Sequence, residues 1–145
     1  MLSETDDRTL MALRIIWVAM VAGQIGFGVV IFMVGPHMQA WADPHLVRLL
    51  FYIALGMLIL DVPLVYLVRA MIYRTRRAPD GTVNIRAYMT GNIVFYALLE
   101  CVSFVALVGW MMSHGQGPHV WIAAAALALQ ALNFPTGAPL TGGGF

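Results

Sequence analysis

Long apolar runs that are almost free of charged residues constrain this chain more than any other feature of its sequence. Four runs stand out, at residues 13–34, 46–68, 87–112 and 119–134. A helix needs about 20 residues to cross the ~30 Å hydrocarbon core of a bilayer, and the first three runs exceed this length. The fourth run is shorter than this and reaches a spanning length only if flanking residues are included. We therefore predict an all-α integral membrane four-helix bundle that forms a single domain over residues 1–134.

The composition supports a membrane location over a water-soluble fold. Of the 145 residues, 61% are hydrophobic and 10% are charged, whereas soluble domains have roughly 45–50% and about 25%. A water-soluble core of this size cannot hide so much apolar surface. The formal net charge of +1 creates no strong field for nucleic acid, so the expected partner is the lipid bilayer.

The distribution of arginine predicts the orientation. Arg8 and Arg14 precede or begin the first run, and the two connections predicted to lie outside hold only Arg48. The segment between the second and third runs holds the other five: Arg69, Arg74, Arg76, Arg77 and Arg86. The positive-inside rule then places both termini and this segment in the cytoplasm, with the protein in a bacterial inner membrane. Arg74, Arg76 and Arg77 are also candidates for binding anionic lipid head groups.

Turn and capping residues mark the boundaries between the runs. Asp43-Pro44 is typical of a helix N-cap followed by Pro at the first helical position. Ala78-Pro79-Asp80-Gly81 is typical of a turn. Residues 135–145 are uncharged and rich in Gly, Pro and Thr, which predicts a flexible C-terminal tail.

Three polar residues are expected at a similar depth in the membrane. At 1.5 Å per residue from the cytoplasmic ends, Gln24 lies roughly 15 Å deep, Asp61 roughly 12 Å and Glu100 roughly 18 Å. A charged carboxylate at such a depth costs several kcal/mol, so we expect one or both acids to be protonated and hydrogen-bonded.

The third run places its polar residues on one helix face. Asn92, Tyr96, Glu100 and Ser103 follow the i, i+4, i+8, i+11 spacing. Two interpretations stay open. One is a proton or ion site on Glu100, with Asp61, Gln24, Tyr96 and Ser103 around it, and the other is a hydrogen-bonded clasp that fixes how the helices pack.

Small residues on the first run predict close contact with another helix. Ala19, Gly23 and Gly26 form a strip that favours helix association, as in a homo-oligomer or a larger membrane complex. No nucleophile–base pair, phosphate-binding loop or metal motif is recognisable in the sequence. We therefore expect a non-catalytic accessory or structural subunit, not an enzyme.

All four histidines fall in or beside the two connections predicted to lie outside: His37, His45, His114 and His119. Imidazole is a common ligand of zinc, copper and iron, so an external metal or haem site is a further hypothesis. The spacing matches no known ligand motif, and no histidine is expected deep in a span. The primary expectation is that the protein holds no cofactor.

Two resemblances to known families are carried by particular segments. Residues 97–107, which include Glu100, resemble the carboxylate helix of the rotor-ring proteolipids of rotary ATPases. In that family the Glu binds the transported proton or sodium ion. A duplicated proteolipid would carry its acid in the fourth helix, whereas Glu100 lies in the third run. Segments 14–24, 97–100 and 133–136 together are similar to a family of small four-helix bacterial membrane proteins, which implies four-helix topology and no particular function.

Overall fold

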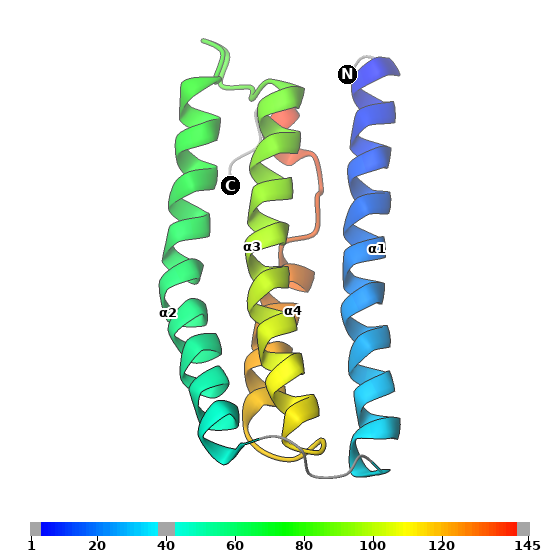
Figure 1. Cartoon of the computed structure of the whole chain (residues 1–145). Helices are drawn as coiled ribbons and strands as arrows, with labels where there is room; N and C mark the ends of the chain where they lie inside the picture. The colour runs from blue at the N-terminus through cyan, green and yellow to red at the C-terminus, as the bar shows by residue number, and fades with distance from the viewer. Residues whose placement is uncertain (1–3, 38–42, 142–145) are drawn as a thin grey trace.

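The fold consists of four α-helices and two short 3-10 turns. The computed structural model describes residues 4–37 and 43–141. Its elements are α1 (Glu4–Val34), a turn at Gly35–His37, α2 (Pro44–Thr75), α3 (Ile85–Met112), α4 (His119–Leu132) and a turn at Ala138–Thr141. Figure 1 shows α3 between α1 and α2, with α4 packed against α3. The prediction of an all-helical, four-helix chain is confirmed.

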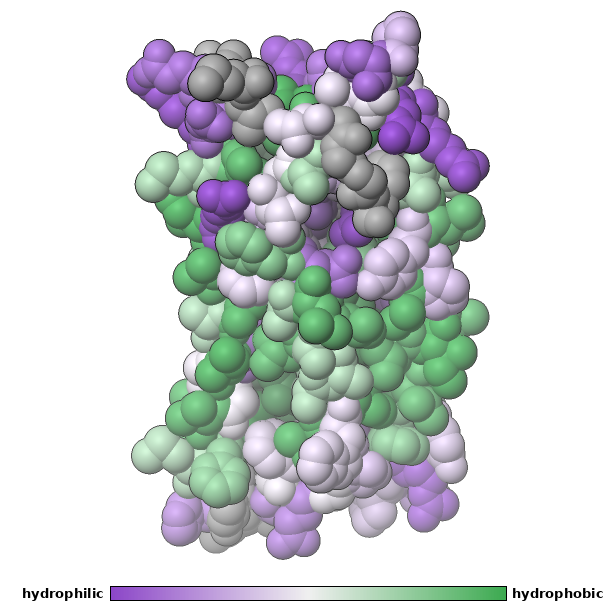
Figure 2. Space-filling view, turned by 180° about the vertical axis from the view of Figure 1, so that it is seen from behind, coloured by the Kyte–Doolittle hydropathy of each residue, from purple (hydrophilic) through white to green (hydrophobic). Residues whose placement is uncertain are grey.

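Helices α1, α2 and α3 are long and apolar enough to cross a membrane. Many of their large apolar side chains are exposed, among them Phe32 at 70% and Leu60 at 69%. Figure 2 shows these side chains as a broad hydrophobic band between two more hydrophilic ends. Lipid covers such a band in a membrane protein, and water would not tolerate an apolar patch of this size. The structure therefore agrees with a membrane protein that has three long spans.

Side-chain caps define where α2 and α3 begin. The Asp43 carboxylate accepts a hydrogen bond from the N–H of His45 at 2.9 Å, and Pro44 occupies the first helical position. This confirms the predicted cap. Asn84 caps α3 in the same way, because its side-chain oxygen accepts from the N–H of Arg86 at 2.9 Å.

The predicted turn between α2 and α3 is also confirmed. The N–H of Gly81 donates to the carbonyl of Ala78 at 2.9 Å, and Gly81 has a φ of 86°, which favours glycine. Thr82 donates its N–H and its hydroxyl to Asp80 at 3.0 and 2.7 Å. These two hydrogen bonds hold the pKa of the Asp80 carboxyl below its usual range.

The fourth apolar run, predicted over residues 119–134, is helical only from His119 to Leu132 and is not among the three helices long enough to cross a membrane. Helix α4 has 14 residues, which rise roughly 21 Å, whereas the hydrocarbon core of a bilayer is ~30 Å thick. The helix ends at Leu132, Asn133 is its C-cap, and Pro135 lacks the N–H that would continue it. The chain then proceeds without helical hydrogen bonds.

Residues 133–141, which include the described part of the tail predicted at residues 135–145, pack against the bundle. They run toward the end of the molecule where α1 and α3 begin and α2 finishes, which we call the arginine-rich end (Figure 1). Pro135, Pro139 and Leu140 are buried, and the Pro139 carbonyl accepts from the N–H of Val83 at 3.0 Å. Composition alone does not reveal this packing, because Gly and Pro suit a tightly fitted extended segment as well as a mobile one. Residues 142–145 lie outside the described residues.

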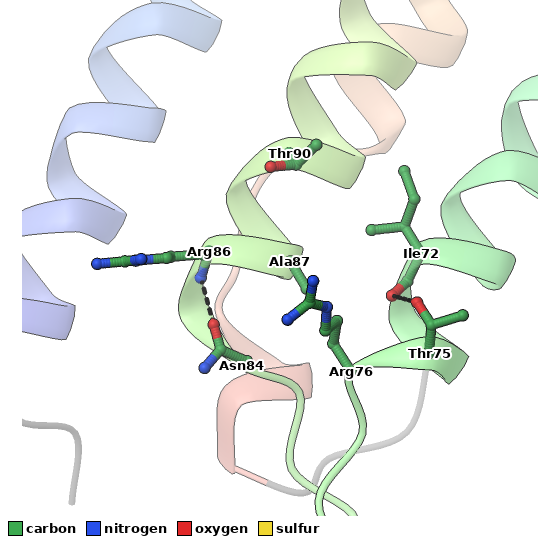
Figure 3. A pocket seen from close by; sticks show the side chains of 7 residues that line it. All are labelled: Ile72, Thr75, Arg76, Asn84, Arg86, Ala87 and Thr90. Atoms are coloured by element: carbon green, nitrogen blue, oxygen red, sulfur yellow. Dashed lines mark hydrogen bonds between the residues drawn. The ribbon is translucent and has the colours of Figure 1, made fainter.

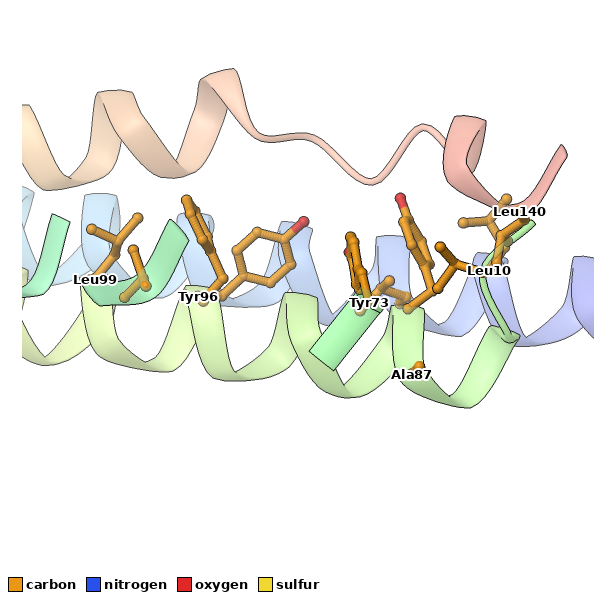
Figure 4. Close-up of a cluster of buried hydrophobic side chains, with 11 residues drawn as sticks. Leu10, Tyr73, Ala87, Tyr96, Leu99 and Leu140 are labelled. Carbon is orange, nitrogen blue, oxygen red and sulfur yellow. The ribbon is translucent and has the colours of Figure 1, made fainter. Parts of the chain in front are cut away.

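Two hydrophobic clusters hold the helices together, one in each half of the molecule. The cluster in the arginine-rich half lies between α3 and the C-terminal segment, as Figure 4 shows. Its labelled members are Leu10, Tyr73, Ala87, Tyr96, Leu99 and Leu140. The other cluster surrounds Ala106 of α3 and Ala126 of α4, which are both fully buried. Small side chains at both positions let the two helix backbones approach closely.

The start of α4 is fixed by a contact between His119 and a glycine of α3. A Cβ atom added to Gly109 would lie 2.5 Å from Cδ2 of His119, so only glycine leaves room for the imidazole ring. The Nε2 atom of His119 is 3.1 Å from the Val47 carbonyl oxygen of α2. One buried ring therefore connects three helices at the end of the molecule opposite the arginine-rich end.

We predict that Gly109→Ala destabilises the protein by about 1–3 kcal/mol, because the added methyl group overlaps the His119 ring. Thermal unfolding in a mild detergent measures the effect. Gly56→Ala is the matched control, because a Cβ there meets nothing within 4 Å. Helix propensity makes that control neutral or slightly stabilising. Equal unfolding temperatures for the two variants would contradict the contact.

Candidate functional site: a polar layer around the end of α4

The segment Asn133–Gly137, which we call the exit segment, brings non-helical backbone into the apolar bundle. In hydrocarbon an unpaired peptide group costs several kcal/mol, so irregular backbone is tolerated there only when protein groups satisfy it. Polar side chains of α1, α2 and α3 converge on this segment and on the last turn of α4. Their arrangement is the most polar feature inside the bundle.

Helix α1 supplies an arginine and a tryptophan. Arg14 donates from Nε to the Pro135 carbonyl at 3.2 Å and from Nη2 to the Thr136 carbonyl at 3.3 Å. Trp17 donates from Nε1 to the Gln130 carbonyl at 3.0 Å. Two guanidinium donors thus satisfy successive carbonyls that have no helical partner. The sequence suggested Arg14 only as a topology signal. In the structure its side chain also stabilises the backbone of the exit segment.

Asn133 is the most connected residue of the exit segment. Its side-chain oxygen accepts from Nη1 of Arg69 at 3.1 Å, and its amide nitrogen donates to the Tyr66 hydroxyl at 2.9 Å and the Leu129 carbonyl at 2.8 Å. Its own carbonyl accepts from the Tyr96 hydroxyl at 2.8 Å. Helices α2 and α3 are therefore both tied to the C-cap of α4.

The polar face of α3 lies toward this layer. Asn92, Tyr96 and Ser103 are each at most 2% exposed, so these three residues of the predicted polar face point into the bundle. Asn92 donates to the Tyr73 hydroxyl at 2.7 Å, and the Tyr88 hydroxyl accepts from the N–H of Gly137 at 3.1 Å. The hydroxyls of Tyr96 and Tyr88 thus connect the polar face of α3 to the two ends of the exit segment.

A cavity of about 220 Å³ remains beside the exit segment. Its polar lining comes from Arg69, Tyr73, Tyr88, Asn92, Asn133 and Thr136. The Arg69 guanidinium also lies over the Phe95 ring, 4.8 Å from the ring centroid. None of the described residues that line this cavity is acidic, so its donors suit a neutral or anionic acceptor better than a cation.

Gln24 finds a partner that the sequence did not suggest. Its Nε2 atom donates to Oε1 of Gln130 at 2.7 Å, and both side chains are at most 2% exposed. Gln130 is the only polar residue between His119 and Asn133, and that isolation is the signal that could have found it. A buried amide pair joins α1 to α4 at the depth where the sequence placed Gln24.

The two acids of the predicted layer do not join this pair. Among the described residues, neither Asp61 nor Glu100 makes a hydrogen bond or an ion pair with the others, and both are half-buried. Gly91 of α3 faces Tyr73 of α2. Glu100 follows Gly91 by nine residues, or about two and a half turns, so it lies on the side of α3 away from α2. The predicted grouping of Glu100 with Asp61 and Gln24 is thus not formed.

The histidines are spread over different environments. His37 and His45 are exposed, His114 is half-buried with a φ of 60°, and His119 is buried in the contact described above. Within residues 4–37 and 43–141, no three His, Cys, Asp or Glu side chains are close enough to hold a metal ion. Metal or haem binding by the histidines stays a prediction.

The arginines after the middle of α2 separate into two sets. Arg69, Arg74 and Arg77 line one groove of about 420 Å³. Arg76 and Arg86 line a different pocket, where their side chains extend in different directions in Figure 3. The lipid candidates Arg74 and Arg77 therefore share a surface, and Arg76 belongs to another.

No protein-family model, curated protein or solved structure matches the chain.

We predict that Gln24→Leu and Gln130→Leu each destabilise the protein by about 1–3 kcal/mol, because each leaves one buried amide without its partner. The double variant Gln24→Leu/Gln130→Leu is expected to lose clearly less than the sum of the two, since both polar groups are then gone. Denaturation of the four proteins in the same detergent gives the coupling energy. Additive losses would contradict a direct bond between the two amides.

Proposed function

We propose that this protein is a non-catalytic accessory subunit of a membrane assembly, either a homo-oligomer or a larger complex. The observation that carries the proposal is Glu100, a half-buried acid in the middle of a long apolar helix with no hydrogen-bond or ion-pair partner among the described residues. An acid within the bilayer is costly unless it is protonated or paired. A second chain is a natural source of the missing partner.

The surroundings of Glu100 support a helix-docking surface. Glu100 lies one turn before Phe104, whose ring packs against Phe27 of α1 with centroids 5.7 Å apart. Glu100 therefore belongs to the flank of the bundle that α1 and α3 form together. Cys101, the next residue, is exposed on α3.

The adjoining face of α1 is made of small residues. Ala19, Gly23 and Gly26 are exposed, and a Cβ added to either glycine would meet nothing within 4 Å. Within the described part of the chain, no atom packs against either glycine of this small-residue strip. Such strips let helix backbones approach closely in membranes, so another helix fits here and brings a hydrogen-bond partner to Glu100.

In this proposal the protein lies in a bacterial cytoplasmic membrane with its arginine-rich end inside. The arginines gather at the end where α1 starts, α2 finishes and α3 starts. The positive-inside rule favours that end for the cytoplasm. The C-terminal segment, described as far as Thr141, returns to the same end as the start of α1, which supports the proposal that both ends of the chain are cytoplasmic.

We expect Gly23→Leu and Glu100→Leu each to release the partner subunits, because the first blocks close approach and the second removes the polar contact. Crosslinking in native membranes, followed by size analysis of the purified complex in mild detergent, measures the association. Gly56→Leu is the matched control on α2, where a Cβ likewise meets nothing within 4 Å. A wild-type protein that is monomeric and co-purifies with nothing would contradict the proposal, as would variants that associate like the control.

The second candidate function is proton or ion handling at Glu100. The same observation favours it, because a half-buried acid that has no partner among the described residues is accessible from the lipid-facing side. Glu100→Gln keeps the size of the side chain and removes its titration, so it should abolish any flux. A liposome flux assay makes the measurement, with Asp61→Asn as a second carboxylate control. Flux that is unchanged in Glu100→Gln would rule out this role.

A further inference from the structure

We propose that the groove on α2 near its C-terminal end binds the phosphate group of an anionic phospholipid. Arg69, Arg74 and Arg77 line this groove of about 420 Å³, together with Tyr66, Ala70 and Tyr73. None of these six residues is acidic. Three guanidinium groups on one surface form a cationic site that a phosphate complements in charge and in hydrogen-bonding geometry.

The two arginines nearest the bilayer have capacity for a ligand. Arg69 donates from one nitrogen to Asn133, which is neutral, and has no ion-pair partner among the described residues. The Arg74 side chain makes no hydrogen bond or ion pair within the described part of the chain. A guanidinium has five N–H donors, so most of these donors remain to be paired.

The depth of the groove matches the head-group region of a bilayer. From Arg77, just beyond the end of α2, to Arg69 the chain covers eight residues, or roughly 12 Å along a helix axis. Beyond the groove, toward the middle of the span, α2 exposes Pro63 and Ile59, which lie about one and two turns before Tyr66 on the same helix face. A cationic groove that continues into exposed apolar surface suits a molecule with a phosphate and acyl chains. A soluble phosphate ion would contact only the cationic groove and would leave the apolar surface uncovered.

The other arginine pocket lacks these properties. Arg76 and Arg86 line a separate space between α2 and α3, and in Figure 3 their guanidinium groups lie apart from each other. The lipid site is thus assigned to the surface of α2 and includes Arg69. From its position in the sequence alone, Arg69 would be interpreted only as a topology signal at the end of a helix.

Binding at this groove would reach the exit segment through a single residue. Arg69 contacts the proposed phosphate on one side and the Asn133 amide on the other. A bound lipid therefore fixes the guanidinium that holds the C-cap of α4, and it should raise the stability of the protein. The inference is independent of the proposed docking flank, which lies on α1 and α3.

Thermal unfolding of the purified full chain in a non-ionic detergent tests the proposal with three added probes: dioctanoyl phosphatidylglycerol, dioctanoyl phosphatidylcholine and inorganic phosphate. We expect phosphatidylglycerol to raise the unfolding temperature by a few degrees at about 100-fold excess over its dissociation constant. Phosphatidylcholine and phosphate at the same concentration should leave it unchanged.

Arg74→Gln should weaken the binding of phosphatidylglycerol about tenfold, because it removes one charge-assisted contact. Its fold should persist, since the Arg74 side chain supports no described hydrogen bond. Arg48→Gln, at the opposite end of α2, is the matched control and should bind like the wild type. An equal shift with phosphate or phosphatidylcholine, the absence of a shift with phosphatidylglycerol, or equal binding by the two variants would overturn the proposal.

Discussion

The structure depends on the hydrogen bonding of a short stretch of backbone that is not helical. Asn133–Gly137 crosses the arginine-rich half of the bundle without the internal hydrogen bonds of a helix. Such backbone is stable at this depth only when each peptide group finds a protein partner. Arg14 from α1, Arg69 from α2 and Tyr96 from α3 supply partners. The need to pair this backbone accounts for many of the polar side chains inside the bundle.

Periodicity and length predicted most of the helical architecture. Runs of more than 20 apolar residues leave little choice but a membrane helix, so the sequence predicted α1, α2 and α3 and also the Asp43-Pro44 cap of α2. The Asn84 cap of α3 was not predicted. The fourth run was harder to interpret, because 14 helical residues followed by Asn-Phe-Pro resemble a marginal span whose end has frayed. Only the surrounding polar side chains show that the helix stops early and the chain continues in order, and those side chains come from distant parts of the sequence.

For the candidate site as well, the sequence predicted some relations between residues and missed others. Helical spacing placed Asn92, Tyr96 and Ser103 on one buried face, because that relation lies within a single helix. Depth arguments grouped Gln24 with Asp61 and Glu100, but equal depth does not determine which way a side chain points around the helix axis. That direction depends on which helices are neighbours. With α3 between α1 and α2, Glu100 lies on the flank opposite the α2 contact, and Gln24 meets Gln130 instead.

The exit segment also constrains the order in which the protein can be completed. Residues 133–141 follow α1, α2 and α3 along the chain, so they are synthesised after the helices whose polar groups they satisfy. Until they dock, Arg14, Arg69 and Tyr96 lack the carbonyl and amide partners that they have in the finished fold. A bundle of the first three helices alone would expose these polar side chains to water, lipid head groups or a chaperone. The small C-terminal segment thus acts as the closing element of the whole bundle.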